Sequence, residues 1–284
     1  MIFRLFLLHG GKDMQDIRSL RKTVAVVGRY LKDATHLYPQ IGLVLGTGWG
    51  DLLTMDGEMT KPLSELPGFK SLGRLEGHAR HLVWGYVAGK PVVALRGRVH
   101  MNEHPTDPRV PFMVRLQVEI LIALGVKTLI LTAAAESLKR DVHVGEVVLV
   151  DGFVTLFMQV SPLFAGEFCS PEDTLDAPLR HMAHRVAPEA LRVTEGGYAM
   201  LRGPFFEGRK YDKVILRQTG ASVVGMSMVP EACVAATHPG VRVLGLAYVT
   251  NSAFEAHSHA TNQARARTDG PLLDTYLKSI ISEL

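Results

Sequence analysis

The chain has 284 residues, 47% of them hydrophobic and 21% charged, and it is therefore long enough to bury a substantial core. Its formal net charge is only +3, with basic and acidic residues interleaved, a pattern that argues against nucleic acid and membrane as partners. Cys169 and Cys233 lack the spacing of a zinc site, and we expect a reducing cytoplasm as the compartment.

The N-terminal residues 1–13 contain a short apolar stretch that an arginine interrupts, and no A-x-A cleavage site follows it. We therefore expect a loose extension or an alternative translation start, and no signal peptide. The rest of the chain, 14–284, is predicted to form a single domain. From Asp16 to Ala34 apolar residues recur at helical spacing, which predicts an amphipathic helix.

A strand and a glycine-rich loop are predicted next, from the sequence IGLVLGTGWG at 41–50. A dinucleotide-binding fingerprint would need a third glycine three places after the second, where this chain has Asp51 or Leu53. The loop is instead suited to one small anion. Thr47 and the nearby backbone N–H groups are predicted to bind inorganic phosphate.

The remaining elements predict an α/β fold with a mixed, mostly parallel central sheet flanked by helices. Residues 81–97 predict a hairpin with its turn at 88–90. Three later stretches each show a helical pattern, a glycine and a buried strand, and such repetition builds a parallel sheet covered on both faces. These stretches are 118–133, 213–227 and 232–251. Residues 262–284 predict a final amphipathic helix.

Small and hydroxyl-bearing residues follow four of the predicted strands. Because ligands of open α/β sheets bind beyond the carboxyl ends of the strands, these segments favour a shared pocket. They are residues 46–48, 132–134, 225–227 and 250–252.

Two further segments carry charged side chains suited to binding. Arg98 and His100, two places apart, would lie on one face of an extended strand and suit an oxyanion, although a surface pair bonded to a carboxylate is the alternative. Glu207 follows two phenylalanines and could accept a hydrogen bond from a ring N–H. Its alternative is the first turn of a helix, where acidic residues are favourable.

Seven motifs together resemble a known family: GLVLGTGWG, EGHARHLVWG, GRVHMNEH, TAAAES, GGYAMLRGPFFE, GMSMVPEACVA and YVTNSA. In order and spacing they are similar to the trimeric purine nucleoside phosphorylases, over residues 20–284. The G-M-S-x-V-P-E stretch is specific to this family and to the related methylthioadenosine phosphorylases. The resemblance implies a nucleoside phosphorylase-like three-layer fold and a homotrimer. It also implies phosphorolysis of 6-oxopurine nucleosides to free base and ribose 1-phosphate in purine salvage, with inorganic phosphate as co-substrate and neither metal nor organic cofactor.

The resemblance also implies site residues. The phosphate site would comprise Thr47, His78, Arg98, His100, the backbone N–H of Ala134 and Ser227. The catalytic residues would be His100, Glu207 and Asn251, with Glu207 holding the purine N1–H and Asn251 its N7 and O6 edge. The other substrate contacts would be Asn102, Ala135, Glu136, Tyr198, Phe206, Met226 and Asn262. A phenylalanine shared between subunits would be Phe157 or Phe164.

Several positions depart from the family pattern. Glu136 replaces a glycine, and Ala133 and Asn102 replace an asparagine and a tyrosine. If Glu136 points inward, it adds negative charge near base and phosphate, which would weaken phosphate binding or select an unusual base. If it points outward, only backbone freedom is lost. Asn262 aligns with the histidine expected near the sugar 5′-hydroxyl, with His257 and His259 upstream.

These departures keep two alternative functions open. One is a phosphorylase for methylthioadenosine or a modified nucleoside. The other is a protein that binds a nucleoside without turning it over.

Overall fold

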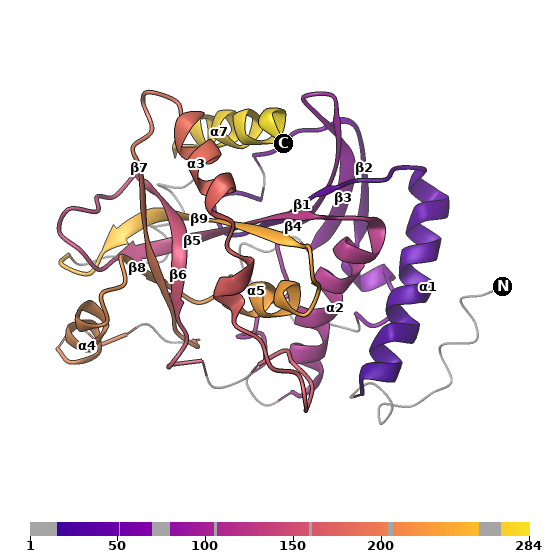
Figure 1. Ribbon diagram of the computed structural model, residues 1–284, viewed down its shortest axis with the longest axis horizontal. Coiled ribbons are helices and arrows are strands. Elements are labelled where there is room, and N and C mark those ends of the chain that lie inside the picture. Colours follow the sequence, from indigo (N-terminus) through magenta and orange to yellow (C-terminus); the bar gives the residue numbers. More distant parts are fainter. Residues whose placement is uncertain are drawn as a thin grey trace.

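The computed structural model describes residues 16–50, 52–69, 80–104, 107–158, 161–203, 207–208, 210–255 and 268–284 (Figure 1). The N-terminal residues 1–13 lie outside the described residues, as do His78, Phe206, His257, His259 and Asn262. No helix in the described part of the chain combines the length and the apolar character needed to cross a membrane.

In the described ranges, nine strands form one mixed sheet in the order β2-β3-β4-β1-β5-β8-β7-β6-β9. A further pairing of β5 with β9 closes β5, β8, β7, β6 and β9 into a ring. The strands are β1 (Ile41–Leu45), β2 (Asp56–Pro62), β3 (His81–Val87), β4 (Lys90–Arg96), β5 (Thr128–Ser137), β6 (Val147–Val154), β7 (Val193–Met200), β8 (Val223–Gly225) and β9 (Arg242–Ser252).

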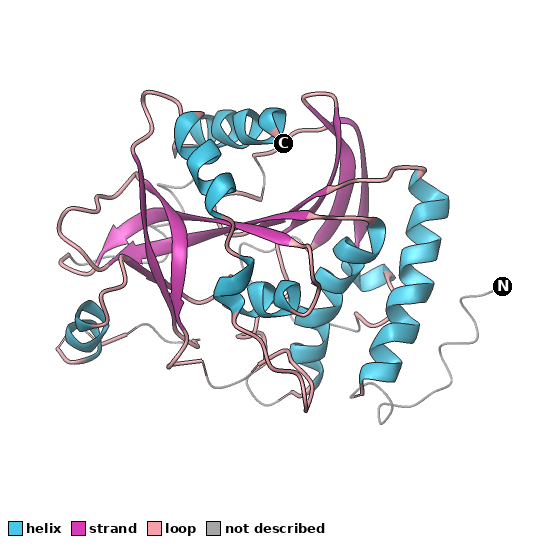
Figure 2. Ribbon diagram, viewed as in Figure 1, coloured by secondary structure: helices cyan, strands magenta, loops and turns pink. Residues whose placement is uncertain are grey.

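Helices cover both faces of this sheet, and Figure 2 shows α3 and α7 on the opposite side from α2 and α5. The helices are α1 (Ile17–Thr35), α2 (Arg109–Leu124), α3 (Ala177–Arg185), α4 (Asp212–Gln218), α5 (Val229–Ala236) and α7 (Gly270–Glu283). Short 3-10 helices span Leu63–Glu65 and Pro171–Thr174. The predicted three-layer α/β architecture is confirmed.

Each face of the sheet has its own hydrophobic core. In β1, Val44 belongs to the core beneath α1, α2 and α5, whereas Leu43 and Leu45 belong to the core beneath α3 and α7. Successive side chains of a strand point to opposite faces, so a strand buried between two layers must be apolar at every position. This requirement explains the unbroken apolar run at 41–45 that predicted the strand.

The predicted local elements are confirmed where the sequence pattern was strong. Helix α1 begins after Asp16, whose carboxylate accepts a hydrogen bond from the Ser19 N–H at 2.6 Å and caps the helix. The hairpin of β3 and β4 turns through Ala88 and Gly89, both at positive φ. The three predicted units are α2 with β5, α4 with β8, and α5 with β9.

Several predictions need correction. Strands β5 and β9 are longer than expected, so 132–134 and 250–252 lie inside strands that pair with each other. Strand β8 runs antiparallel to β5, which is compatible with the predicted mixed sheet. The final helix is found from Gly270, with proline in its first turn, and residues 262–267 lie outside the described part. Strands β2, β6 and β7 had no predicted counterpart.

Candidate functional site

The glycine loop after β1 is tied to strand β5. The Gly46 N–H donates to Thr132 Oγ1 at 3.0 Å, and the Trp49 N–H donates back to the Gly46 carbonyl at 3.0 Å. A Cβ at position 46 would lie 2.7 Å from the Thr132 carbonyl oxygen and 2.9 Å from Arg98 Nη2. Glycine is therefore required at this close approach, and the half-buried Thr47 lies at the tip of a fixed turn.

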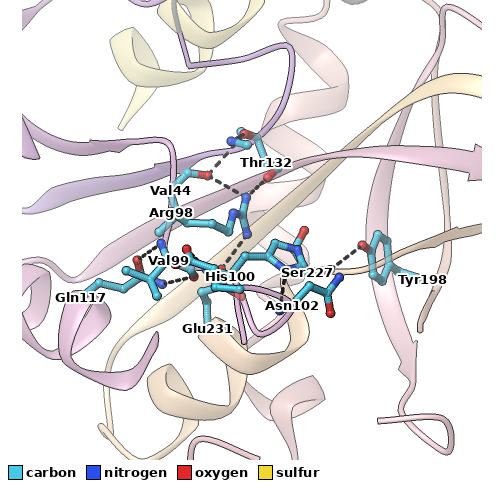
Figure 3. Close-up of polar contacts among 12 residues, drawn as sticks. Val44, Arg98, Val99, His100, Asn102, Gln117, Thr132, Tyr198, Ser227 and Glu231 are labelled. Atoms are coloured by element: carbon cyan, nitrogen blue, oxygen red, sulfur yellow. Dashed lines mark hydrogen bonds and ion pairs between the residues drawn. The ribbon is translucent and has the colours of Figure 1, made fainter. Parts of the chain in front are cut away.

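Arg98 lies in the interior of the protein (Figure 3). Its side chain is 1% exposed, and Nη1 lies 2.7 Å from Glu231 Oε1. Nη2 donates to the carbonyls of Val44 and Thr132. The expected strand carrying both Arg98 and His100 is wrong, because β4 ends at Arg96. His100 is half-buried, while Arg98 is turned into the core toward Glu231.

The segment after Arg98 is held by a side-chain amide from α2. The Val99 N–H donates to Gln117 Oε1 at 2.8 Å, and Gln117 Nε2 donates to the Val99 carbonyl at 3.1 Å. Gln117 thus satisfies both backbone groups, as a neighbouring strand would. The next residue, His100, accepts a hydrogen bond from the Asn102 N–H on Nδ1 at 3.1 Å. The backbone N–H of His100 donates to Glu103 Oε1 at 2.9 Å.

Asn102, Met226 and Tyr198, which were expected around the base and the sugar, lie close together near Ser227. Asn102 Nδ2 is 3.4 Å from Met226 Sδ, and the Ser227 N–H donates to the Tyr198 hydroxyl at 3.3 Å (Figure 3). Tyr198 is fully buried, and this burial raises its pKa to about 12 although hydrogen bonds from Ser227 act in the opposite direction. The tyrosine is neutral at physiological pH and positions the backbone of Ser227.

This packing makes Gly225 sensitive to substitution. A Cβ at position 225 would overlap the hydroxyl of Tyr198, whereas one at Gly50 would meet its nearest neighbours at 3.7 Å. We expect Gly225→Ala to lower the free energy of unfolding by about 1–3 kcal/mol, the usual cost of overpacking. Gly50→Ala is the matched control and should stay within about 0.5 kcal/mol. Urea unfolding of both variants checks this, and equal midpoints would contradict it.

On the base side, Glu136 points inward, which answers the question that the sequence left open. Its Oε2 accepts hydrogen bonds from Asn251 Nδ2 at 2.6 Å and from Lys213 Nζ at 2.7 Å. Lys213 Nζ also lies 3.5 Å from Glu207 Oε1. Glu207 precedes α4, which begins at Asp212, so its alternative placement in a first helical turn is wrong.

The environment of Glu136 changes its acidity. Burial is the largest influence and raises its pKa, the Lys213 ammonium lowers it, and the charge and hydrogen bond of Glu207 raise it further, to about 7. A carboxyl group with this pKa exchanges its proton near neutral pH. Because Glu136 and Glu207 interact directly, the titration belongs to the pair.

The structure thus brings the described site residues to one region at the carboxyl ends of β1, β5 and β9. Ala134 and Ala135 lie within β5 and pair with Tyr248 and Val249 of β9. Val224 of β8 pairs with Glu136 of β5, and the two strands are antiparallel. The residues that follow Val224, Met226 and Ser227 among them, therefore run back toward Ala134 and Ala135. Among the described residues, no three His, Cys, Asp or Glu side chains gather as a metal site would require.

Sequence reasoning missed three residues that hold this region. Glu231 is the acidic residue of the G-M-S-x-V-P-E motif, and an acid in an otherwise apolar helix could have been noticed in the sequence. Gln117 is likewise a polar residue within a mostly apolar stretch of α2, and it could have been noticed for the same reason. Lys213 gave no such indication, because a lysine near the start of a short helix is normally solvated.

The model of the phosphorylase superfamily matches residues 40–282. The purine nucleoside phosphorylase of Bos taurus is 34% identical over 251 residues, covering 83% of this chain and 84% of that protein. Purine nucleoside phosphorylase 1 of Geobacillus stearothermophilus is 34% identical over 242 residues, covering 82% and 85%.

A solved structure shows the same fold. Isoform 2 of purine nucleoside phosphorylase from Schistosoma mansoni, in complex with cytosine and ribose-1-phosphate, superposes with a TM-score of 0.83 at 28% identity. The match covers 93% of this chain and 96% of that one.

Proposed function

Because this chain belongs to the purine nucleoside phosphorylase family, within the phosphorylase superfamily, we propose that it cleaves 6-oxopurine nucleosides with inorganic phosphate. The substrates are inosine, guanosine and their deoxy forms, and the products are the free base and a ribose 1-phosphate. The observation that carries the proposal is the convergence of the glycine loop, Ser227 and Asn251 on the end of β5. This reaction serves purine salvage in the cytoplasm.

In the proposed reaction, the bond between C1′ and N9 breaks and the purine keeps the electron pair. Positive charge develops on the sugar, as in glycoside hydrolysis, and negative charge on the base. Glu207 holds the N1–H of the base, and Asn251 donates to its N7 and O6 edge, where hydrogen bonds strengthen as charge develops. A phosphate oxygen then bonds to C1′. Neither a metal nor an organic cofactor takes part in these steps.

The phosphate would lie against the glycine loop. Thr47, Ser227 and the backbone N–H of Ala134 supply neutral donors, and His100 and His78 complete the site. Arg98 Nη1 lies 2.7 Å from the Glu231 carboxylate, so a phosphate that binds this guanidinium shares it with Glu231. Arg98 also holds the carbonyls of Val44 and Thr132, and through Thr132 the glycine loop itself.

We also propose a homotrimer, in which a phenylalanine of one subunit completes the site of the next. The two candidates differ in their surroundings. The Arg115 guanidinium lies 5.0 Å from the centre of the Phe164 ring, and the same arginine forms ion pairs with Glu119 and Glu167. Phe157 packs against the small core that contains Leu138.

The test is the release of hypoxanthine from inosine by the purified protein, followed by ultraviolet absorbance with and without phosphate. We expect release only with phosphate. Release without phosphate would indicate hydrolysis. Turnover confined to methylthioadenosine or another modified nucleoside would support the alternative that the departures at Asn102 and Glu136 leave open. Nucleoside binding without any turnover would support a binding protein.

A further inference from the structure

Four polar side chains form a buried group at the proposed base site, here called the Glu136 cluster: Glu136, Glu207, Lys213 and Asn251. The side chains of Lys213, Glu136 and Glu207 are 2%, 5% and 5% exposed, and Asn251 is 6% exposed. Burying this many polar groups is costly unless each has partners. Here Asn251 Nδ2 and Lys213 Nζ both donate to Glu136 Oε2, at 2.6 and 2.7 Å.

Lys213 fixes where the Glu136 carboxyl lies. Helix α4 begins at Asp212, so Lys213 is held in its first turn, and its ammonium group is buried between two carboxyl groups. An unpaired ammonium would be strongly unfavourable at such a position. The pairing therefore holds Glu136 against Asn251, the residue assigned to the O6 edge of the base.

These contacts fix the hydrogen-bonding direction of the Asn251 side chain. In this structure its amide nitrogen donates to Glu136, while Thr250 Oγ1 donates to its Oδ1 at 2.9 Å. A base that enters the site meets the Glu136 carboxyl beside that amide. A protonated carboxyl donates a hydrogen bond and suits a 6-oxo group, whereas an ionised carboxyl accepts one and suits a 6-amino group.

On the basis of the proposed function, we propose that Glu136, positioned by Lys213, determines which 6-substituent of the purine the site accepts. Protonated Glu136 favours 6-oxopurines, and ionised Glu136 favours 6-aminopurines. The site thus takes both classes of nucleoside in a proportion that pH controls.

The charged groups that face Glu136 set the direction of this dependence. In the described residues, α4 contributes Lys213, the segment before it contributes Glu207, β9 contributes the neutral Asn251, and β8 pairs through the apolar Val224. Burial and Glu207 favour the protonated form, and Lys213 favours the ionised form. Raising the pH through about 7 removes the proton held by the Glu136–Glu207 pair and leaves Glu136 ionised, so the preference for inosine over adenosine falls.

The experiment measures kcat/KM for inosine and adenosine at pH 6 and pH 8, and takes their ratio. Ionisation of phosphate affects both substrates equally and cancels from the ratio. The ratio should fall by roughly tenfold or more between the two pH values, because the protonated fraction of Glu136 changes that much. Glu136→Gln offers a donor and an acceptor at every pH, so its ratio should stay constant.

Two further variants make the test specific. Lys213→Met removes the group that lowers the pKa of Glu136, so the midpoint of the change should move to higher pH, a shift that loss of packing alone would not produce. Glu146→Gln is the matched control, because Glu146 is 3% exposed and pairs with Arg192 outside the cluster. Its ratio should follow that of the unmodified protein.

The outcomes separate this inference from the proposed function. If phosphorolysis occurs but the inosine-to-adenosine ratio of kcat/KM does not change with pH in the unmodified protein, the role of Glu136 is overturned and the proposed function stands. The same holds if the ratio still changes with pH in Glu136→Gln. If neither nucleoside is cleaved, the proposed function fails, and calorimetric binding of hypoxanthine and adenine at both pH values tests Glu136 directly. A pH-dependent preference between the bases that Glu136→Gln abolishes would uphold the role, and its absence would overturn it.

Discussion

Glu231→Ala is expected to lower the free energy of unfolding by about 3–5 kcal/mol, the cost of leaving a buried charge without its partner. The Arg98 guanidinium is 1% exposed and lies 2.7 Å from Glu231 Oε1. Loss of that carboxylate breaks this buried ion pair, while the hydrogen bonds from Nη2 to the carbonyls of Val44 and Thr132 remain. Urea unfolding followed by circular dichroism measures the change, with the m-value checking that the unfolding remains two-state.

A double variant shows whether the unpaired charge is the cause. Arg98→Met with Glu231→Leu replaces the ion pair with apolar side chains, an exchange that is often close to neutral for stability. We expect it to recover most of the stability lost in Glu231→Ala and to lose phosphate-dependent activity. A Glu231→Ala variant within about 1 kcal/mol of the unmodified protein would show that the pair does not support the fold.

Asn251→Ala is expected to lower kcat/KM for inosine by about 10²–10³-fold, the usual loss when one donor to developing negative charge is removed. The fold should tolerate the change. Glu136 keeps its ion pair with Lys213, and Thr250 Oγ1 also lies 3.3 Å from the Ala135 carbonyl. Steady-state kinetics with inosine at saturating phosphate measure the loss.

Thr250→Val provides the control for Asn251→Ala. It keeps the shape of the side chain and removes only the hydroxyl that donates to Asn251 Oδ1 at 2.9 Å. Its kcat/KM should fall much less, because the amide itself stays in place. Equal losses in the two variants, or an Asn251→Ala enzyme with unchanged kcat, would remove Asn251 from the catalytic step.

The sequence was sufficient for elements whose pattern is local. Helix α1, the hairpin of β3 and β4, and the three pairs of helix and strand follow from periodicity and glycine placement. Closure of the ring was not predictable, because it depends on β9 pairing with β5 on one side and β6 on the other. Strand β2 was missed because it is exposed along most of its length and lacks an apolar face.

In the candidate site, too, some features follow from local sequence and others depend on contacts between distant parts of the chain. The small residues after the predicted strands favoured one shared region, and the structure brings them to β5 although 132–134 and 250–252 lie inside β5 and β9. Side-chain direction does not follow from local sequence. Glu136 points inward because of Lys213, which is 77 residues away, and Arg98 is turned into the core by Glu231, which is 133 residues away. Only the folded chain brings these charges together.

The measurement that tests the central claim most directly is phosphorus NMR of the protein incubated with inosine and inorganic phosphate. Phosphorolysis predicts that the inorganic phosphate resonance declines while a ribose 1-phosphate resonance grows in equal amount, together with free hypoxanthine. Hypoxanthine formed while the phosphate resonance stays unchanged, or no reaction with any purine nucleoside, would contradict the account.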